Sequence, residues 1–258
     1  PNTNFTILAE ERLYKNILHA NNVSFLAYPK NYLDNYFIKR VFSKINKFYY
    51  QKNQFQKRKS FLSKIKNSFD GILTIGGSIF MENNDKRLLE FNNHLLFLKV
   101  FHDKPKFILG ANFGPYTSDA FLKHFKSVLG KYNDVCFRDS YSKSLFSELE
   151  NIRNHPDVVF SGNFKPNEKI PNTIGFSVMD LTYRSGLSSY KEQYISWIIT
   201  KIIAANEARK RIYLFSFCEY EGDERAINEI IERLPSEIKN TINTILYKGN
   251  INEFLTHY

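Results

Sequence analysis

A regular alternation of short β-rich runs with longer helical patterns is the feature that most constrains the fold of this chain. In the first half, strands are predicted at 5–8, 23–26, 71–75, 106–109, 134–137 and 158–160, and helices at 10–20, 86–101, 118–129 and 139–149. Strands separated by helix-length segments are typical of parallel sheets, because a parallel crossover needs a long connection. The sequence therefore predicts an α/β fold.

The same rhythm restarts after residues 161–171, a segment that contains two prolines, one glycine and few apolar residues. Segments of this composition often connect domains. Beyond it, strands are predicted at 173–179, 211–217 and 241–246, and helices at 190–209, 223–233 and from 250 onward. We therefore expect an N-terminal domain at 1–162, with a basic helical insertion at 35–69, and a C-terminal domain at 163–258.

The composition limits what else the chain can be. With 258 residues, of which 43% are apolar, it can bury a substantial core, and no apolar run approaches the roughly 20 residues of a membrane-spanning helix. The two cysteines, Cys136 and Cys218, each lie in an apolar run, which predicts buried thiols in a reducing cytoplasm rather than a disulfide. The six histidines include no close ligand pair, so no metal site is expected.

The net charge of +10 arises largely from residues 35–69, which contain ten lysine and arginine residues and no acidic residue. Phe, Ile and Leu recur among these cations at three- and four-residue spacings, which predicts one or two basic amphipathic helices. An anionic membrane surface, nucleic acid and a phosphorylated substrate would each suit such a face. A solvated basic face above an ordinary core stripe is the remaining interpretation.

A glycine turn, Gly76-Gly77-Ser78, follows the predicted strand at 72–75. Backbone N–H groups in such a turn can approach an anion because no Cβ intervenes. Ligands bind at the carboxyl ends of parallel strands, so this turn is a candidate binding loop. It lacks the glycine spacing of a dinucleotide site and the lysine of a P-loop. A purely structural tight turn is the alternative.

Two further predicted strand ends carry polar side chains. Asn112 follows one strand and offers a side-chain amide, while Arg138 and Asp139 follow the next. A guanidinium presents the planar pair of donors that suits a carboxylate or phosphate. Arg138 is therefore the first candidate for anion binding, oriented by Asp139 or Asp157. The alternative is a structural salt bridge between Arg138 and one of these aspartates.

In the second half, a polar connection containing Cys218, Glu221 and Asp223 joins a predicted strand to the helix at 223–233. Its position after a parallel strand makes it a second candidate binding loop. The alternative role for Asp223 is to cap the helix that it begins.

Five of these segments together carry a family resemblance. They read Gly-Gly-Ser-Ile-Phe at 76–80, Leu-Gly-Ala-Asn-Phe-Gly-Pro at 109–115, Phe-Arg-Asp-Ser-Tyr-Ser at 137–142, Pro-Asp-Val-Val-Phe at 156–160 and Phe-Ser-Phe-Cys-Glu-Tyr-Glu-Gly-Asp at 215–223. In this order and at these spacings they are similar to the polysaccharide pyruvyl transferase family, over roughly residues 70–250.

The resemblance implies two facing Rossmann-like domains with parallel sheets, a GT-B-like arrangement with ligands in the cleft between them. The expected ligand-binding residues are Gly76, Gly77, Ser78, Asn112, Arg138 and Asp139 in the first domain, and Ser177, Cys218, Glu221 and Asp223 in the second. Both domains are expected to be incomplete at the chain ends, because the family's opening Gly-Asn loop and its later Arg-x-His element have no match here. His257 is not part of that element, so the general acid is expected outside this chain.

The activity implied by the resemblance is transfer of the enolpyruvyl group of phosphoenolpyruvate to a sugar, forming a pyruvate ketal. The acceptor would belong to a cell-surface polysaccharide or its lipid-linked precursor, and no cofactor is needed. We expect a cytoplasmic enzyme, with residues 35–69 in peripheral contact with the inner face of the cytoplasmic membrane and no nucleic-acid partner. The alternatives are a GT-B glycosyltransferase that uses a nucleotide sugar and a noncatalytic membrane- or RNA-binding module.

Overall fold

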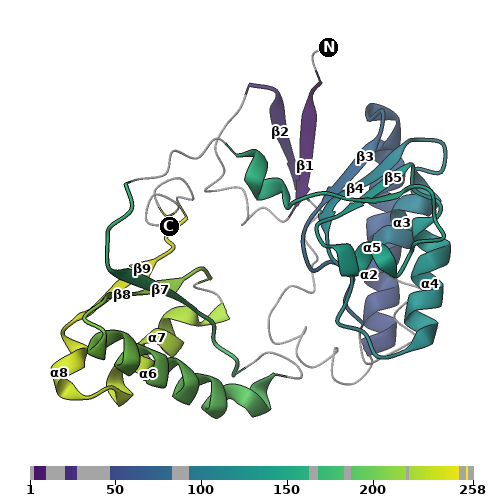
Figure 1. Cartoon of the computed structure of the whole chain (residues 1–258). Helices are drawn as coiled ribbons and strands as arrows, with labels where there is room; N and C mark the ends of the chain where they lie inside the picture. The colour runs from purple at the N-terminus through teal and green to yellow at the C-terminus, as the bar shows by residue number, and fades with distance from the viewer. Residues whose placement is uncertain are drawn as a thin grey trace. The chain divides into compact units, whose positions relative to one another are not determined.

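The computed structural model describes residues 3–9, 21–27, 47–82, 93–162, 168–182, 187–218, 221–249 and 254. The chain divides into two compact units, Pro1–Gly162 and Asn163–Tyr258 (Figure 1). Every strand pairing between the named strands of the described residues is parallel. The α/β fold class with parallel sheets, expected from the alternating sequence pattern, is therefore confirmed.

The first unit contains two parallel sheets. One pairs β1 (Phe5–Ala9) with β2 (Val23–Ala27), and the other has the strand order β3 (Ile72–Ile75), β4 (Lys106–Ala111), β5 (Asp134–Phe137) and β6 (Ile152–Asn154). The helices are α2 (Lys47–Ile65), α3 (Asn93–Val100), α4 (Asp119–Leu129) and α5 (Ser140–Ser144), with 3-10 turns η2 (Lys66–Ser68) and η4 (Val158–Ser161). This order brings the carboxyl ends of four strands to one edge of the larger sheet.

Phenylalanine dominates the core of the first unit. Phe80, Phe113, Phe125, Phe137 and Phe146 are all buried in one cluster. Their rings meet mostly edge to face, with centroids 5.2 Å apart for Phe80 and Phe125 and 4.8 Å apart for Phe113 and Phe146. Since Phe80 and Phe113 lie in the loops at the carboxyl edge of the sheet, the same packing that builds the core fixes those loops.

Helix α2 packs its apolar side against α3 and the sheet. Phe55 and Leu62 are buried together with Leu96, Val100 and Phe101. The amphipathic helix predicted within the basic segment is thus confirmed for Lys47–Ile65, and these apolar side chains belong to the core. None of the helices in the described part of the chain is long and apolar enough to cross a bilayer.

The second unit has one parallel sheet, in the order β7 (Thr173–Val178), β8 (Arg211–Ser216) and β9 (Ile242–Leu246). Its helical elements are η5 (Ser188–Tyr190), α6 (Lys191–Glu207), α7 (Asp223–Arg233) and α8 (Ser236–Lys239). Figure 1 shows α6 and α7 on one side of this sheet. Both helices point isoleucine side chains toward buried residues of β8, which accounts for their apolar stripes.

Two sequence predictions are wrong. The run Val158–Phe160 is not a strand, because Asp157 caps a 3-10 turn there and its Oδ1 accepts a hydrogen bond from the Val159 N–H at 3.1 Å. The edge strand is instead β6, in which only Ile152 is buried, so its sequence carries almost no apolar signal. The helix expected to run to Leu149 ends at Ser144.

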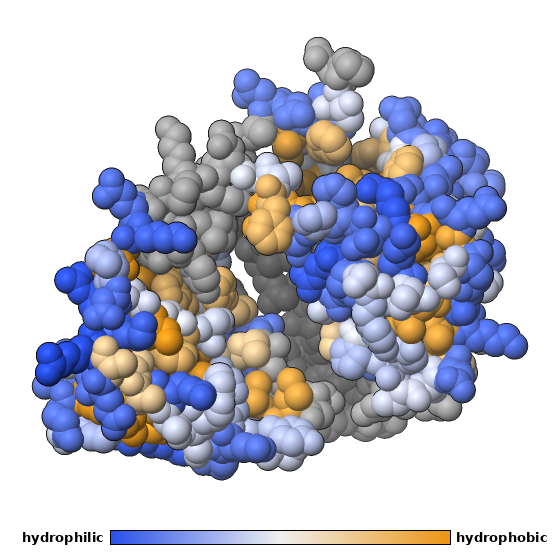
Figure 2. Space-filling view, viewed as in Figure 1, coloured by the Kyte–Doolittle hydropathy of each residue, from blue (hydrophilic) through white to orange (hydrophobic). Residues whose placement is uncertain are grey.

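Other predictions fall wholly or partly outside the described residues: the helices at 10–20 and from 250 onward, the first part of the helix at 86–101, and residues 35–46 of the basic insertion. On the face shown in Figure 2, apolar side chains are scattered in small groups among hydrophilic ones.

Candidate functional site

Arg138 leaves the carboxyl end of β5 and lies directly against Gly77. Its backbone N–H donates to the Ala111 carbonyl at 2.8 Å, which fixes where the side chain begins. A Cβ added at Gly77 would lie within 2.9 Å of Cζ, Nη1 and Nη2 of Arg138. Glycine at position 77 is therefore required for the guanidinium to occupy this place.

Two side chains hold the Arg138 guanidinium in a fixed orientation. Nη1 donates to Oδ2 of Asp157 at 2.7 Å, and Nη2 donates to Oδ1 of Asn112 at 2.8 Å. The Ser78 hydroxyl donates to the same Asn112 oxygen at 3.2 Å. The Arg138 side chain nevertheless keeps 36% of its surface exposed, so a ligand can still reach it.

Asp157 is itself held by the turn that it begins. The Val158 side chain packs against Gly110, where a Cβ would lie 3.0 Å from Val158 Cγ1. Gly110 has a φ of +72° at an irregularity in the β4–β5 pairing, a conformation that favours glycine. The hydrogen bond from Arg138 holds the pKa of the Asp157 carboxyl below its usual range. Asp157 is thus ionised and oriented toward the guanidinium.

The Asp139 carboxylate is engaged by Ser142 and not by Arg138. It caps α5, with Oδ1 accepting from the Ser142 N–H at 2.7 Å and Oδ2 accepting from the Ser142 hydroxyl at 2.8 Å. The Ser142 oxygen in turn accepts from the Phe113 N–H at 2.8 Å. Of the two aspartates considered for Arg138, the structure pairs Asp157 with it, while Asp139 fixes the loop beyond β4.

The arrangement has the chemistry of an anion site. Gly76, Gly77, Ser78, Asn112 and Arg138 meet at the carboxyl edge of β3, β4 and β5, as expected for loops that follow neighbouring parallel strands. Within the described residues, the N–H groups of Gly77 and Ser78 donate to no other residue. These two donors and the outer edge of the guanidinium can receive a carboxylate or a phosphate.

Glu82 helps to fix the loop that follows the glycine turn, and it was not predicted from the sequence. Its carboxylate accepts hydrogen bonds from the side chains and backbone N–H groups of Thr117 and Ser118 at the start of α4. The Ser118 hydroxyl, together with these other donors, lowers the pKa of Glu82 from 4.5 to about 2. Glu82 therefore anchors the end of the glycine-turn loop to a helix. The adjacent pair Thr117-Ser118 before a helix was the available signal for such a partner.

In the second unit, Asp223 joins the ends of two strands. It is only 2% exposed, and its Oδ2 accepts from the N–H groups of Cys218 at 2.9 Å and Phe217 at 3.3 Å. Its Oδ1 accepts from the Asp180 N–H at 3.2 Å. Because Gly222 occupies the cap position of α7, the Asp223 carboxylate connects loops rather than capping the helix.

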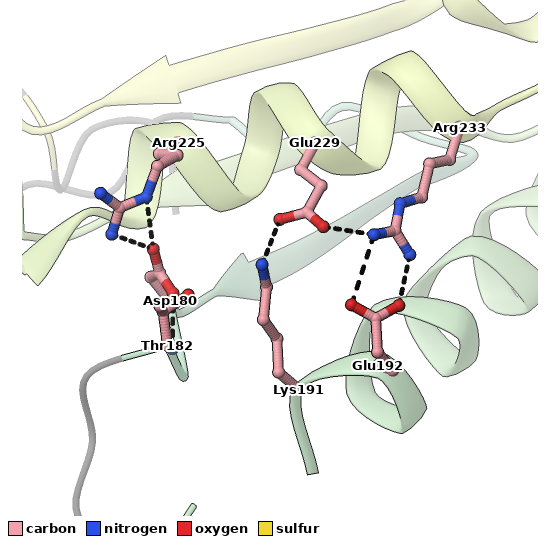
Figure 3. A network of polar contacts seen from close by, with 7 residues as sticks. All are labelled: Asp180, Thr182, Lys191, Glu192, Arg225, Glu229 and Arg233. Atoms are coloured by element: carbon pink, nitrogen blue, oxygen red, sulfur yellow. Dashed lines mark hydrogen bonds and ion pairs between the residues drawn. The ribbon is translucent and has the colours of Figure 1, made fainter. Parts of the chain in front are cut away.

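Asp180 forms a second buried contact in this unit, seen in Figure 3. Its Oδ2 accepts from Nε of Arg225 at 2.8 Å and also from Nη2, while Oδ1 accepts from the Thr182 N–H at 2.7 Å. Burial acts to raise the pKa of Asp180, but the hydrogen bonds from Thr182 and Arg225 outweigh it and the pKa lies below its ordinary value. Asp180 was not among the residues singled out from sequence.

Ser177 and Glu221 are both exposed. The Ser177 carbonyl accepts from the Tyr194 hydroxyl at 3.4 Å, and the Glu221 N–H donates to the Cys218 carbonyl at 3.3 Å. The sequence-predicted residues of the second unit therefore lie at the ends of β7 and β8, but only Cys218 and Asp223 contact each other through a side chain. In the described part of the chain, no group of three or more His, Cys, Asp or Glu side chains could hold a metal ion.

Comparison with known proteins matches residues 7–258 to the family described as Polysaccharide pyruvyl transferase. No curated protein shows a significant match. Among solved structures, an α,α-trehalose-phosphate synthase (UDP-forming) from Burkholderia vietnamiensis is similar, with a TM-score of 0.50 and 11% identity over 99% of this chain and 76% of that chain. At this identity the likeness concerns the fold alone, and it agrees with the GT-B-like class expected from sequence.

Proposed function

The chain belongs to the polysaccharide pyruvyl transferase family, and from this membership we propose that it transfers the enolpyruvyl group of phosphoenolpyruvate to a sugar, forming a pyruvate ketal. The acceptor is a sugar of a cell-surface polysaccharide or of its lipid-linked precursor. The observation that carries the proposal is the Arg138 guanidinium, which is held over Gly77 by Asn112 and Asp157.

The proposed donor needs this kind of site. Phosphoenolpyruvate carries a carboxylate and a phosphate on one carbon, so a binding site must supply a cation and several N–H donors within a small space. Arg138 supplies the cation, and the N–H groups of Gly77 and Ser78 supply further donors beside it. Asn112 and Asp157 are positioning residues, because each contacts the guanidinium and fixes its plane.

The proposed reaction balances without a cofactor. A proton is added to the methylene carbon of phosphoenolpyruvate, which becomes a methyl group and leaves the adjacent carbon cationic. One sugar hydroxyl adds to that carbon and loses its proton. The bond to phosphate then breaks, and the second hydroxyl takes its place and loses its proton. Arg138 stabilises the negative charge that the departing phosphate gains or holds the carboxylate in place, and both roles need a fixed cation.

Asp157 is unsuited to supply the proton. The hydrogen bond from Arg138 lowers the pKa of Asp157, so the carboxylate is ionised near neutral pH. Its Oδ2 also accepts a hydrogen bond from Arg138. The proposal therefore assigns Asp157 to orientation alone.

The enzyme is proposed to act in the cytoplasm, at the inner face of the cytoplasmic membrane. Lipid-linked acceptors would be reached there, and the ten cations of residues 35–69 suit an anionic lipid surface. A glycosyltransferase with a nucleotide-sugar donor would share the fold class, and it differs in the donor that it binds and consumes.

Calorimetric titration with phosphoenolpyruvate tests the donor site. Asp157→Asn weakens one charged contact to Arg138, and losing such a contact at a partly exposed site should lower affinity about tenfold. Arg138→Lys keeps the charge but loses the planar pair of donors, and it should lower affinity by at least as much.

Arg153→Lys is the matched control. Arg153 also forms an ion pair with an aspartate, since its Nε lies 2.8 Å from Oδ1 of Asp134, and this pair does not involve the glycine turn. It should bind phosphoenolpyruvate like the unchanged chain. If all three variants bind equally well, or if the unchanged chain binds a nucleotide sugar and not phosphoenolpyruvate, the assignment is wrong.

A further inference from the structure

The exposed side of α2 is a cationic surface without a carboxylate. Lys52, Lys57, Lys59 and Lys64 are all exposed, and the helix contains no Asp or Glu along its 19 residues. We refer to these four lysines as the α2 lysine face. Short polar side chains lie between them on the same side of the helix, namely Gln56, Ser60 and Ser63.

Helical spacing arranges the four lysines in two rows. Lys52 and Lys59 are seven residues apart, as are Lys57 and Lys64, and seven residues are two turns or about 10.5 Å along the axis. The rows flank the short polar side chains, so long lysine side chains from both rows can reach one plane. The whole helix is about 28 Å long at 1.5 Å per residue. The four lysines themselves, from Lys52 to Lys64, cover about 18 Å of this length.

The apolar side of α2 is not available to a partner. Phe55 is 5% exposed and Leu62 is 1% exposed, and Phe61 and Ile65 pack against the same cluster. The exposed side of α2 carries no large apolar side chain among its described residues. Over residues 51–65, where the structure describes the α2 side chains, a partner of the α2 lysine face would therefore meet charged and polar groups rather than apolar ones.

The four lysines have no role that the described fold accounts for. Across the part of the chain that the structure describes, none of them forms an ion pair or side-chain hydrogen bond, whereas Lys126 pairs with Glu148 and Lys191 with Glu229. Four like charges on one helix side repel one another and destabilise the helix slightly. An anionic partner would remove that repulsion.

From these observations we infer that the α2 lysine face is an electrostatic docking surface for an anionic lipid bilayer, to which it adsorbs without inserting. Two parallel rows of lysines suit a plane of phosphate headgroups, to which each lysine adds independently. Nucleic acid is less suited, because among residues 51–65, the α2 residues whose side chains the structure describes, no arginine is exposed for planar phosphate recognition and no aromatic ring is exposed for base stacking. The membrane contact proposed above for residues 35–69 is thereby assigned to one side of α2, and it does not depend on the reaction chemistry.

Sedimentation with vesicles tests this inference with the full chain. The protein should bind vesicles of phosphatidylglycerol and phosphatidylcholine at low salt and should not bind vesicles of phosphatidylcholine alone. Binding should be lost at about 0.5 M salt, where the screening length falls to a few ångströms. Changing all four lysines of the face to Gln should weaken binding at least about 25-fold, since each engaged lysine contributes about fivefold and at least two should engage.

A matched variant controls for net charge. It changes four exposed lysines outside α2 to Gln, namely Lys123, Lys131, Lys143 and Lys210. This control should bind anionic vesicles within about threefold of the unchanged chain, and both variants should keep the thermal unfolding midpoint of the parent, because all the changed side chains are exposed.

Three results would overturn the inference. The control variant could lose binding as strongly as the α2 variant, which would make the effect one of net charge. The chain could raise the pressure of a lipid monolayer, which would show insertion. A single-stranded RNA or duplex DNA could compete fully with vesicles and itself bind more tightly through the same four lysines, which would make nucleic acid the partner.

Discussion

Acid should destabilise the first unit through one buried histidine. His94 is 6% exposed, its ring lies 4.5 Å from that of Phe80, and its Nδ1 is 3.3 Å from the Tyr132 hydroxyl. Burial lowers the pKa of His94 from 6.5 to about 4, because the imidazolium would lose its hydration there. Replacing His94 with Phe keeps a ring in this aromatic cluster and removes the proton-binding group.

The sign of the effect follows from which state binds the proton first. The folded pKa is the lower one, so as the pH falls below about 6.5 the unfolded chain is protonated and the folded chain is not. The contribution of His94 to stability is therefore intact above pH 6.5, falls between 6.5 and 4, and is fully lost below that. At about 1.4 kcal/mol per pH unit, the total loss is about 3.5 kcal/mol, and about 2.5 kcal/mol of it is reached by pH 4.5.

Urea unfolding at pH 7 and pH 4.5 measures this loss. Amide hydrogen exchange in β4 and β5 follows the first unit, and the fluorescence of Trp197, the single tryptophan, follows the second. The His94→Phe variant should lose about 2.5 kcal/mol less than the parent between these two pH values in the first unit, with no difference in the second. Equal losses in the parent and the variant would show that His94 does not cause the acid sensitivity of the first unit.

Two further predictions concern the site and its support. Gly77→Ala should leave the unfolding midpoint nearly unchanged, because the added Cβ meets the flexible end of the Arg138 side chain. It should weaken phosphoenolpyruvate binding, because that Cβ displaces the guanidinium. Gly130→Ala, at the end of α4, is the control and should change neither the midpoint nor the binding strongly. Lys106→Met should destabilise the first unit by about 2 kcal/mol in urea unfolding, because the buried Nζ donates to the Phe101 carbonyl at 2.8 Å and that acceptor would lose its charged partner. An unchanged midpoint for Lys106→Met would show that water replaces the ammonium group.

Most strands could be predicted because their own residues are apolar and β-branched. β5 and β8 are buried along most of their length, and both were expected within one residue of their observed ends. The strand predicted at Val158–Phe160 was wrong because its residues are also apolar and β-rich but tertiary contacts decide their conformation. Three residues that suit a strand form a 3-10 turn, because the Asp157 carboxylate binds the Val159 N–H and Val158 fills the space beside Gly110.

The site could be predicted in part for a similar reason. Parallel topology brings consecutive strand ends to one edge, so Gly77, Asn112 and Arg138 were expected together. Which aspartate would contact Arg138 could not be predicted, since Asp139 and Asp157 both suited the pairing. Asp157 is the partner because the Asp139 carboxylate caps α5 by accepting a hydrogen bond from the Ser142 N–H. Such a choice is decided by tertiary contacts that local sequence does not encode.

We propose that this chain consumes phosphoenolpyruvate through a donor site built on Arg138. The most direct measurement is the rate of phosphate release from phosphoenolpyruvate in the presence and absence of a polysaccharide acceptor, for the parent and for Arg138→Lys. Release should depend on the acceptor and should leave a pyruvate ketal on the sugar. Arg138→Lys should raise the KM for phosphoenolpyruvate or abolish turnover at a nearly unchanged unfolding midpoint. Consumption of a nucleotide sugar in place of phosphoenolpyruvate, or unaltered kinetics in Arg138→Lys, would show that the proposed donor site is wrong.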